Sequence, residues 1–176
     1  LKKLVCEYLR SLSIIEDEKL DTELIQFREA LKSVSGIITT NYDLLLDNLC
    51  DKNEFKPVIG QKGLLSQSHT IFVDEIFKIH GCVSDEQSII LTKKDYENFL
   101  EKQKYILGKL MVIFTEYPII FIGYSLDDKN ILTILEDLSI SLSVEELKKV
   151  SEKWIFVSRE VGIDDLIIKE HTVYIR

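Results

Sequence analysis

The sequence predicts an α/β fold, a Rossmann-like parallel sheet with helices on both faces. Short apolar and β-branched runs alternate along the 176-residue chain with longer segments whose apolar residues recur every three or four positions. The short runs are typical of strands buried on both faces, and the longer segments are typical of amphipathic helices. Strands and helices in alternation favour a parallel sheet.

Length and composition favour one packed domain over residues 1–176. The chain is 45% hydrophobic and 30% charged, with only seven Gly and two Pro, which is the profile of a globule. A domain of this length buries about 70% of the surface that its unfolded chain exposes. The sequence does not begin with Met, so we expect either a removed tag or an internal piece of a longer protein.

Charge and cysteine content exclude several classes of function. The 22 basic and 30 acidic residues give a net charge of −8, and without a basic stripe we expect no direct nucleic-acid partner. The three cysteines, Cys6, Cys50 and Cys82, form no Cys-x-x-Cys pair, so we expect neither a disulfide framework nor a zinc ribbon, and a cytoplasmic location fits best. No segment reaches the roughly 20 apolar residues of a membrane helix, and no signal peptide is recognisable.

The first third of the chain predicts three helices and a strand. Apolar residues at helical spacing predict a helix over residues 2–15. Asp21 is a candidate cap for a second helix. Its expected inner face consists of Leu24, Phe27, Ala30 and Leu31. Residues 36–40, Gly-Ile-Ile-Thr-Thr, predict a buried strand, and Asp43 begins a helix that ends at Cys50.

The middle of the chain predicts a long loop followed by a second main strand. Residues 53–69 are rich in Gly, Lys, Gln and Ser, with one short candidate strand at residues 57–60. Residues 75–80 form the second strand and end in His80-Gly81, and residues 88–92 are a further extended piece. Thr92 and Asp95 form a capping box for a helix that continues to about Glu116.

The remaining elements repeat the same alternation. The run Pro-Ile-Ile-Phe-Ile-Gly at residues 118–123 is the clearest buried strand, because its apolar residues lie between two helix breakers. The elements expected after it are a helix over residues 128–138, a helix over 144–151 capped by Ser143, a strand over 153–157, a short helical turn from Asp164, and a strand over 172–175 that closes the sheet.

Polar residues follow four of these strands. In open parallel sheets, ligands bind beyond the carboxyl ends of the strands. The segments at these ends are Thr39-Thr-Asn-Tyr-Asp43, His80-Gly81, Gly123-Tyr-Ser125 and Ser158-Arg159. We therefore expect the ligand site to be built from these four segments.

Each segment also has a purely structural interpretation. Asn41 or Asp43 alone would serve as a helix cap, although a cap does not need both. His80 alone is more typical of a tight turn with a partly buried imidazole, and its place at a strand end favours the functional interpretation. At Gly123 the two interpretations coexist, because a turn without a side chain and the free N–H groups of a helix start also suit a phosphate. Asp127 and Asp128 are better helix caps, since carboxylates repel a diphosphate.

Four motifs in one order resemble the SIR2-like domain. They are Thr-Thr-Asn-Tyr-Asp, Lys-Ile-His-Gly, Leu-Thr-Lys-Lys-Asp-Tyr and Phe-Ile-Gly-Tyr-Ser-Leu-Asp-Asp, between residues 37 and 128. Each motif is a weak signal, but the ordered set is specific. It resembles the bacterial SIR2-like NADases of antiphage defence more than the sirtuin protein deacylases. The strand that ends in Phe-Val-Ser-Arg corresponds more loosely to the place where sirtuins contact the adenosine part of NAD.

The resemblance implies an NAD glycohydrolase, which cleaves NAD to nicotinamide and ADP-ribose. It implies Asn41 and His80 as the catalytic pair and Asp43 near the nicotinamide carboxamide, with NAD as substrate and no metal. The full set of implied NAD-binding residues is Thr39, Thr40, Asn41, Asp43, His80, Gly123, Tyr124, Ser125 and Ser158. The chemistry suits these residue types, because cationic nicotinamide departs neutral and leaves an oxocarbenium-like ribose. Asn41 would orient the ribose or the attacking water, and a neutral His80 would accept a proton.

Two departures from the family pattern leave alternatives open. Sirtuin deacylases carry a zinc module with four cysteines, so three scattered ones disfavour deacylation of lysine. The family's Gly-rich phosphate loop precedes the Thr-Thr-Asn-Tyr-Asp segment, and no Gly occurs before Gly36. We therefore expect the Gly-rich strand and loop to be missing and the chain to be a fragment of a larger protein. A non-catalytic module that senses NAD or ADP-ribose is the main alternative, followed by a structural or oligomerisation domain. The full-length protein is expected to be a homo-oligomer or to carry a fused sensor domain.

Overall fold

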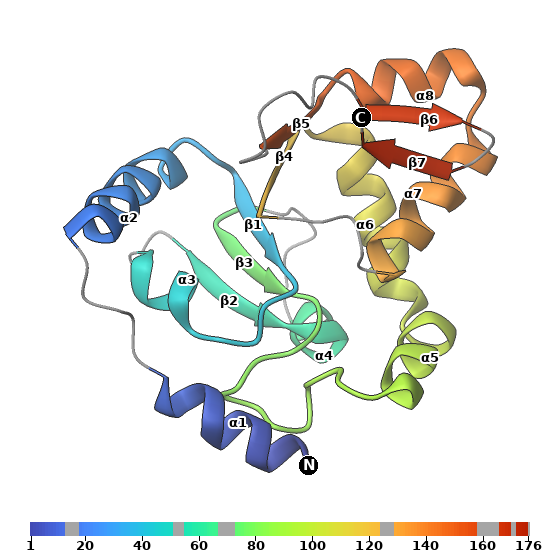
Figure 1. The fold of residues 1–176 in the computed structure, drawn as a ribbon. Coiled ribbons are helices and arrows are strands. Elements are labelled where there is room, and N and C mark those ends of the chain that lie inside the picture. The colour runs from blue at the N-terminus through green and yellow to red at the C-terminus, as the bar shows by residue number, and fades with distance from the viewer. Residues whose placement is uncertain are drawn as a thin grey trace. The chain divides into compact units, whose positions relative to one another are not determined.

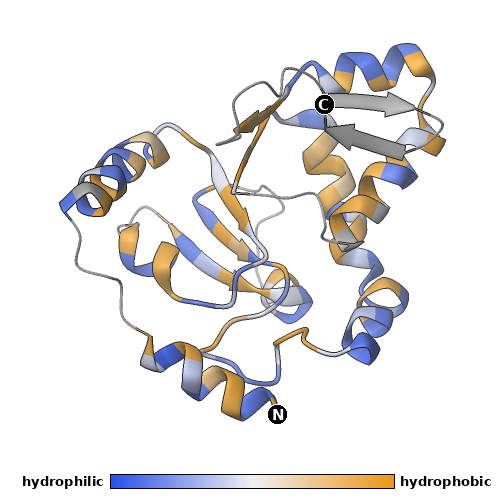
Figure 2. Ribbon diagram, in the orientation of Figure 1, coloured by the Kyte–Doolittle hydropathy of each residue, from blue (hydrophilic) through white to orange (hydrophobic). Residues whose placement is uncertain are grey.

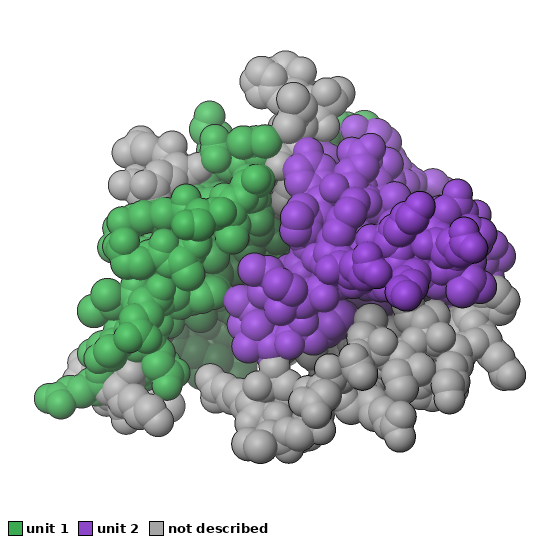
Figure 3. Space-filling model, turned by 90° about the horizontal axis from the view of Figure 1, so that it is seen from above, with its two compact units in different colours: residues 1–99 green, residues 100–176 purple. Residues whose placement is uncertain are grey.

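A computed structural model describes residues 1–12, 18–50, 55–66, 73–123, 129–157, 166–169 and 172–175 of the chain. The chain forms two compact units, residues Leu1–Phe99 and Leu100–Arg176, which are coloured separately in Figure 3. Among the described residues, no helix has both the length and the apolar character needed to cross a bilayer.

A three-stranded parallel sheet forms the centre of the first unit (Figure 1). Strands β1 (Gly36–Thr39), β2 (Lys56–Ile59) and β3 (Glu75–Lys78) lie in the order β1-β3-β2. All three end in register, with Thr39 of β1 and Ile59 of β2 both paired with Lys78. The predicted α/β fold with a parallel sheet is thus confirmed, and the short candidate strand in the long loop is β2.

Helices cover both faces of this sheet. Successive strand residues point to opposite faces, so Ile37 and Ile76 share one face while Phe77 and Val58 share the other. On the first face, Ile76 belongs to one apolar cluster with residues of α2 (Glu18–Leu31) and α3 (Leu45–Leu49). On the second face, α4 (Gly60–Leu65) lies against Val58 at its residue Gly63. The central strand β3 is buried along its whole length.

Helix α1 (Lys2–Ser11) packs on the segment that follows β3. Its Cys6 is fully buried in a cluster with Cys82, Val83 and Ile89. Arg10 donates a hydrogen bond to the carbonyl oxygen of Val83 from the same helix. The helix predicted over residues 2–15 is therefore present but shorter, because it ends at Ser11 and the backbone of Leu12 is extended.

Two details of the second helix differ from the prediction. Asp21 lies within α2, which begins at Glu18, and so it does not cap the helix. Leu31 is buried and Phe27 packs against the same cluster, but Ala30 is exposed. The apolar period places only part of the predicted inner face correctly. The third helix, α3, begins two residues after Asp43 and ends one residue before Cys50.

The long helix predicted after Thr92 is two helices. Helix α5 (Lys93–Lys102) and helix α6 (Lys104–Glu116) are separated at Gln103, whose backbone is not helical. The predicted capping box is confirmed: Thr92 Oγ1 accepts from the Asp95 amide at 3.2 Å, and Asp95 Oδ2 accepts from the Thr92 amide at 2.9 Å. Residues 88–92 form no strand.

An aromatic cluster forms the centre of the second unit. Strands β4 (Ile119–Ile122) and β5 (Trp154–Val157) are parallel, and Figure 2 shows that both are apolar. Phe121 stacks on Phe156 with ring centroids 4.2 Å apart, and on Phe114 of α6 at 5.9 Å. Trp154 lies edge-on to Phe114 and donates from its indole N–H to the Phe114 carbonyl oxygen at 3.0 Å.

The opposite side of these two strands is exposed. Ile120 and Ile122 of β4 and Ile155 and Val157 of β5 each keep more than half of their surface accessible. The prediction that residues 118–123 and 153–157 form buried strands is therefore correct for one face of each strand and wrong for the other. Helix α7 (Lys129–Ser141) follows β4. Helix α8 (Val144–Ser151) is capped by Ser143, as predicted, and Glu146 completes a capping box with it.

The last two strands form their own hairpin. Strand β6 (Leu166–Lys169) pairs with β7 (Thr172–Ile175) in an antiparallel two-stranded sheet. The prediction that residues 172–175 close the parallel sheet is thus wrong, because their partner is the preceding strand. The turn predicted at Asp164 lies outside the described residues.

Candidate active site

Three polar side chains follow the three strands of the first unit at equivalent positions. Thr39, Lys78 and Ile59 are paired across the sheet at the ends of their strands. The second residue after each of them is Asn41, His80 and Gln61, respectively. Because the strands are parallel and in register, all three residues leave the sheet at its carboxyl-terminal edge. In sheets of this type, that edge is where ligands bind.

The segment after β1 places Asn41 where a ligand can contact it. Thr39 is 9% exposed, and its hydroxyl accepts from the Asn41 amide at 3.1 Å, which turns the chain out of the sheet. Asp43 Oδ1 accepts from the Leu45 amide at 2.8 Å at the start of α3, whose N-cap residue is Leu44. The side chain of Asn41 is exposed. The side-chain hydrogen bond at the start of α3 thus comes from Asp43 and not from Asn41. Thr40 lies between them and is half-buried.

The imidazole of His80 is held in one orientation by two aromatic rings. Tyr96 and Phe99 of α5 both meet it edge to face, with ring centroids at 5.5 and 5.8 Å. The His80 carbonyl oxygen accepts from the Ile90 amide at 2.9 Å. His80 is 2% exposed. A ligand can therefore touch only a small part of this ring.

The segments that carry Asn41 and His80 are bonded to each other. The Val83 amide donates to the Tyr42 carbonyl oxygen at 2.8 Å, and the Tyr42 hydroxyl donates to the carbonyl oxygen of Ile90. Tyr42 is adjacent to Asn41, and Val83 is three residues after His80. The two strand-end segments thus form one connected layer above the sheet.

Lys78 and Gln61 were not among the predicted site residues. Lys78 is 1% exposed, and its ammonium group lies 2.6 Å from a carboxylate oxygen of Asp47. Gln61 has a buried amide oxygen that accepts no hydrogen bond from the described residues. The sequence signal for Lys78 is a charged residue at the end of a strand with an apolar centre, two residues before a histidine. Gln61 has no comparable signal, because it lies within a segment predicted to be a loop.

The remaining predicted residues belong to the second unit. Gly123 follows β4 with φ +62° and has open space around it. That backbone conformation suits a glycine and leaves room for a ligand to approach the main chain. Tyr124, Ser125 and Ser158 lie outside the described residues.

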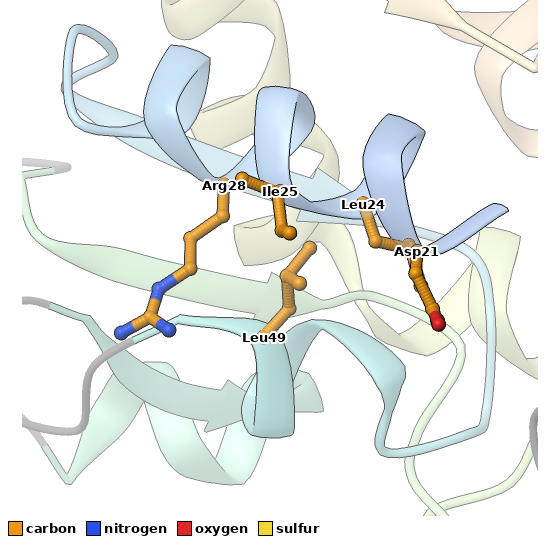
Figure 4. Close-up of a pocket in the computed structure, with 5 residues that line it drawn as sticks. All are labelled: Asp21, Leu24, Ile25, Arg28 and Leu49. Carbon is orange, nitrogen blue, oxygen red and sulfur yellow. The ribbon is translucent and has the colours of Figure 1, made fainter. Parts of the chain in front are cut away.

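A hollow elsewhere in the first unit is not part of this site. It lies between α2 and α3 and is open to solvent (Figure 4). The residues that line it are Asp21, Leu24, Ile25, Arg28 and Leu49. None of them follows a strand end.

Within the described ranges, no group of three or more His, Cys, Asp or Glu side chains is placed to hold a metal ion.

Comparison with known families identifies the chain. The sequence profile of the SIR2-like domain matches residues 35–172, which is more than half of the sequence. The chain belongs to the SIR2-like domain family. The matched range of this SIR2-like chain includes all of the predicted site residues from Thr39 to Ser158.

Three curated proteins are similar to parts of this SIR2-like chain. Defense-associated sirtuin 2 of Bacillus subtilis is 29% identical over 104 residues, which is 56% of this chain and 10% of that protein. NAD(+) hydrolase ThsA of Enterococcus faecium is 30% identical over 103 residues, 57% of this chain and 21% of that protein. NAD(+) hydrolase ThsA of Bacillus cereus is 26% identical over 132 residues, 73% of this chain and 26% of that protein. The chain therefore spans between a tenth and about a quarter of the length of these relatives.

Proposed function

We propose that the full-length protein is an NAD glycohydrolase and acts as an effector of bacterial antiphage defence. The observation that carries the proposal is the equivalent placement of Asn41 and His80, each the second residue after paired ends of adjacent parallel strands. Two of the similar proteins are named NAD(+) hydrolases, and a third is named a defence-associated sirtuin. An amide and an imidazole at one sheet edge are suited to a nucleotide sugar.

The proposed reaction breaks the bond between the nicotinamide nitrogen and the ribose C1′. The bonding electrons stay with the nitrogen, so nicotinamide leaves as a neutral molecule and an oxocarbenium-like ribose remains. Asn41 orients the ribose or the attacking water. Water forms the new C1′–O bond, and its proton passes to His80 and then to solvent. General-base assistance of this kind is typically worth about 10²–10⁴-fold.

The surroundings of His80 fit a proton acceptor of fixed orientation. Tyr96 and Phe99 pack against its ring edge to face, which leaves the imidazole few alternative rotamers. A fixed base close to the reacting water avoids the entropy cost of finding it. Asp43, whose carboxylate accepts a hydrogen bond from the Leu45 amide, would lie near the nicotinamide carboxamide through its place in the same segment.

Release of free nicotinamide tests the proposal. The activated full-length protein is incubated with NAD, and nicotinamide is separated and quantified by chromatography. We expect Asn41→Ala and His80→Ala each to lower kcat/KM by about 10²-fold or more, with melting temperatures recorded for both. Asn48→Ala is the matched control, because Asn48 is an exposed asparagine of the nearby α3. Wild-type turnover in both site variants would refute the catalytic assignment.

A non-catalytic sensor of NAD or ADP-ribose is the second candidate. The observation that favours it is the 2% exposure of His80, which restricts contact with a reacting water. Calorimetry with intact ADP-ribose separates the two functions. Tight binding without any nicotinamide release from the activated protein would support the sensor, and turnover would exclude it.

A further inference from the structure

A buried cation lies directly beneath the candidate site. Lys78 is the last residue of the central strand β3 and is 1% exposed. An ammonium group removed from water costs several kcal/mol unless nearby acceptors replace its hydration. The chain therefore has to supply acceptors close to the end of this side chain.

Three groups from three segments meet the Lys78 ammonium group. It donates hydrogen bonds to the carbonyl oxygen of Asp43 and, at 3.4 Å, to Cys82 Sγ. It also lies 2.6 Å from Asp47 Oδ2 as an ion pair that lacks hydrogen-bond alignment. Asp43 follows β1, Asp47 belongs to α3, and Cys82 follows His80. A lysine has three N–H donors, and here each partner belongs to a different segment.

These contacts bridge the two segments that carry the predicted catalytic residues. Asp43 is two residues after Asn41, and Cys82 is two residues after His80. Lys78 also pairs with Thr39 in the sheet, so its backbone and its side chain both set the distance between the segments. Its ammonium group is engaged by Asp43, Cys82 and Asp47, so we assign it to these segments and not to a substrate.

We propose that Lys78 is a positioning residue that fixes the separation of Asn41 and His80 through its ammonium group. This inference rests on the proposed NAD glycohydrolase function. A misplacement of about 1 Å in a catalytic group can lower turnover about 10²-fold. Loss of the bridge therefore reduces kcat more than it changes the KM for NAD.

The effect of this ion pair on stability can be separated from its effect on the position of the two segments by a double substitution. Removal of one partner leaves a buried, unpaired charge and is strongly destabilising, whereas an apolar pair of similar volume is often neutral or stabilising. Lys78→Met alone would leave Asp47 unpaired. The double variant Lys78→Met/Asp47→Leu removes both charges and keeps the volume filled. It also removes the hydrogen bonds to Asp43 and Cys82.

The test measures turnover and melting temperature of the full-length protein. We expect the double variant to melt within a few degrees of wild type, with kcat lowered about 10- to 100-fold and KM changed much less. Lys56→Met is the matched control, since Lys56 is an exposed lysine of strand β2 in the same sheet, and it should keep both parameters. A double variant with wild-type melting temperature and wild-type kcat overturns the inference.

Hydrogen exchange provides a readout that does not depend on catalysis. The Val83 amide, which donates to the Tyr42 carbonyl oxygen across the two segments, should exchange about tenfold faster in the double variant, while amides within β3 keep their protection. Unchanged exchange at Val83 contradicts the positioning role. If wild-type protein releases no nicotinamide, the proposed function fails, and the exchange of this amide still decides whether Lys78 holds the segments together.

Discussion

Gly81, the residue after His80, is the position where a single added methyl group should do the most damage. Its backbone has φ +93°, a conformation that residues with a side chain rarely adopt. A Cβ atom there would lie 2.5 Å from the carbonyl carbon of Ser88 and 2.7 Å from the amide nitrogen of Ile89. Both neighbours are main-chain atoms, so no side-chain rotation can relieve the overlap.

The expected cost of Gly81→Ala is about 2–5 kcal/mol of unfolding free energy. The left-handed backbone contributes roughly 1–2 kcal/mol, and forcing an extra carbon into a packed region contributes roughly 1–3 kcal/mol. In a protein of this size, each kcal/mol corresponds to about 2–4 °C in melting temperature. The substitution should also displace His80 and lower NAD turnover.

Substitutions at two other glycines distinguish the cost of the left-handed backbone from the cost of the steric overlap. Gly60 has φ +55° but nothing within 4 Å of its Cβ position, so Gly60→Ala should cost only the backbone part, about 1–2 kcal/mol. Gly108 lies inside α6 with open space around it, and Gly108→Ala should stabilise the protein by about 0.5–1 kcal/mol.

Urea unfolding followed by circular dichroism measures all three variants under one set of conditions. The predicted order of stability is Gly108→Ala, then wild type, then Gly60→Ala, then Gly81→Ala. A Gly81→Ala protein no less stable than Gly60→Ala would show that the close approach of the Ser88 backbone is absent, and the argument for this turn would fail.

Three further substitutions test the packing and the helix ends. Asp95→Asn should lower the free energy of unfolding by about 1–2 kcal/mol at neutral pH. Burial alone would raise the pKa of the Asp95 carboxyl, but its hydrogen bonds outweigh burial and hold the pKa below its ordinary value of 3.8. The difference in stability between wild type and Asp95→Asn should therefore persist above about pH 3.8 and shrink as the pH falls further. A difference in stability that does not change with pH would contradict this. Ser143→Ala removes the cap of α8 and should lower the free energy of unfolding in urea by about 1 kcal/mol. Ser141→Ala, at an exposed helix end, should lower it little. Equal losses in the two variants would exclude the capping role of Ser143. Phe121→Ala should lower the free energy of unfolding by about 3–5 kcal/mol and Ile120→Ala by much less, because Phe121 is 9% exposed and Ile120 52% exposed. The fluorescence of the single tryptophan reports the unfolding. Similar losses of stability in the two variants would contradict the assignment of Phe121 to the aromatic core.

Strands bounded by helix breakers were predictable from local sequence. The run that starts at Gly36 and the run between Pro118 and Gly123 both form strands within a residue of their predicted limits. β-branched residues restrict the backbone, and Gly or Pro ends the extended segment. These signals are contained in a few adjacent residues, so no tertiary information is needed to recognise them.

The break at Gln103 could not be predicted in this way. The segment from Asp95 to Glu116 contains no proline, and its apolar period continues through the break. The two helices separate because α5 packs against His80 through Phe99, while α6 packs against Phe121 through Phe114. Tertiary partners, not local propensity, decide where the first helix ends.

The site shows the same division. The ends of the predicted strands point to Asn41 and His80 as candidates, because a polar residue after an apolar strand is visible in the sequence. Lys78 was not identified, since a charged residue in a strand is normally assigned to a solvated face. Only the acceptors that fold around it, above all Asp47, explain why an ammonium group is stable inside this sheet.

The structure of the full-length protein with a non-hydrolysable NAD analogue would show whether Asn41 and His80 share one NAD site. We expect the nicotinamide ribose to lie at the carboxyl-terminal edge of the β1-β3-β2 sheet, with Asn41 and His80 both within hydrogen-bonding distance of the ribose or its attacking water. An analogue bound at any other edge, or one that contacts neither side chain, would contradict it.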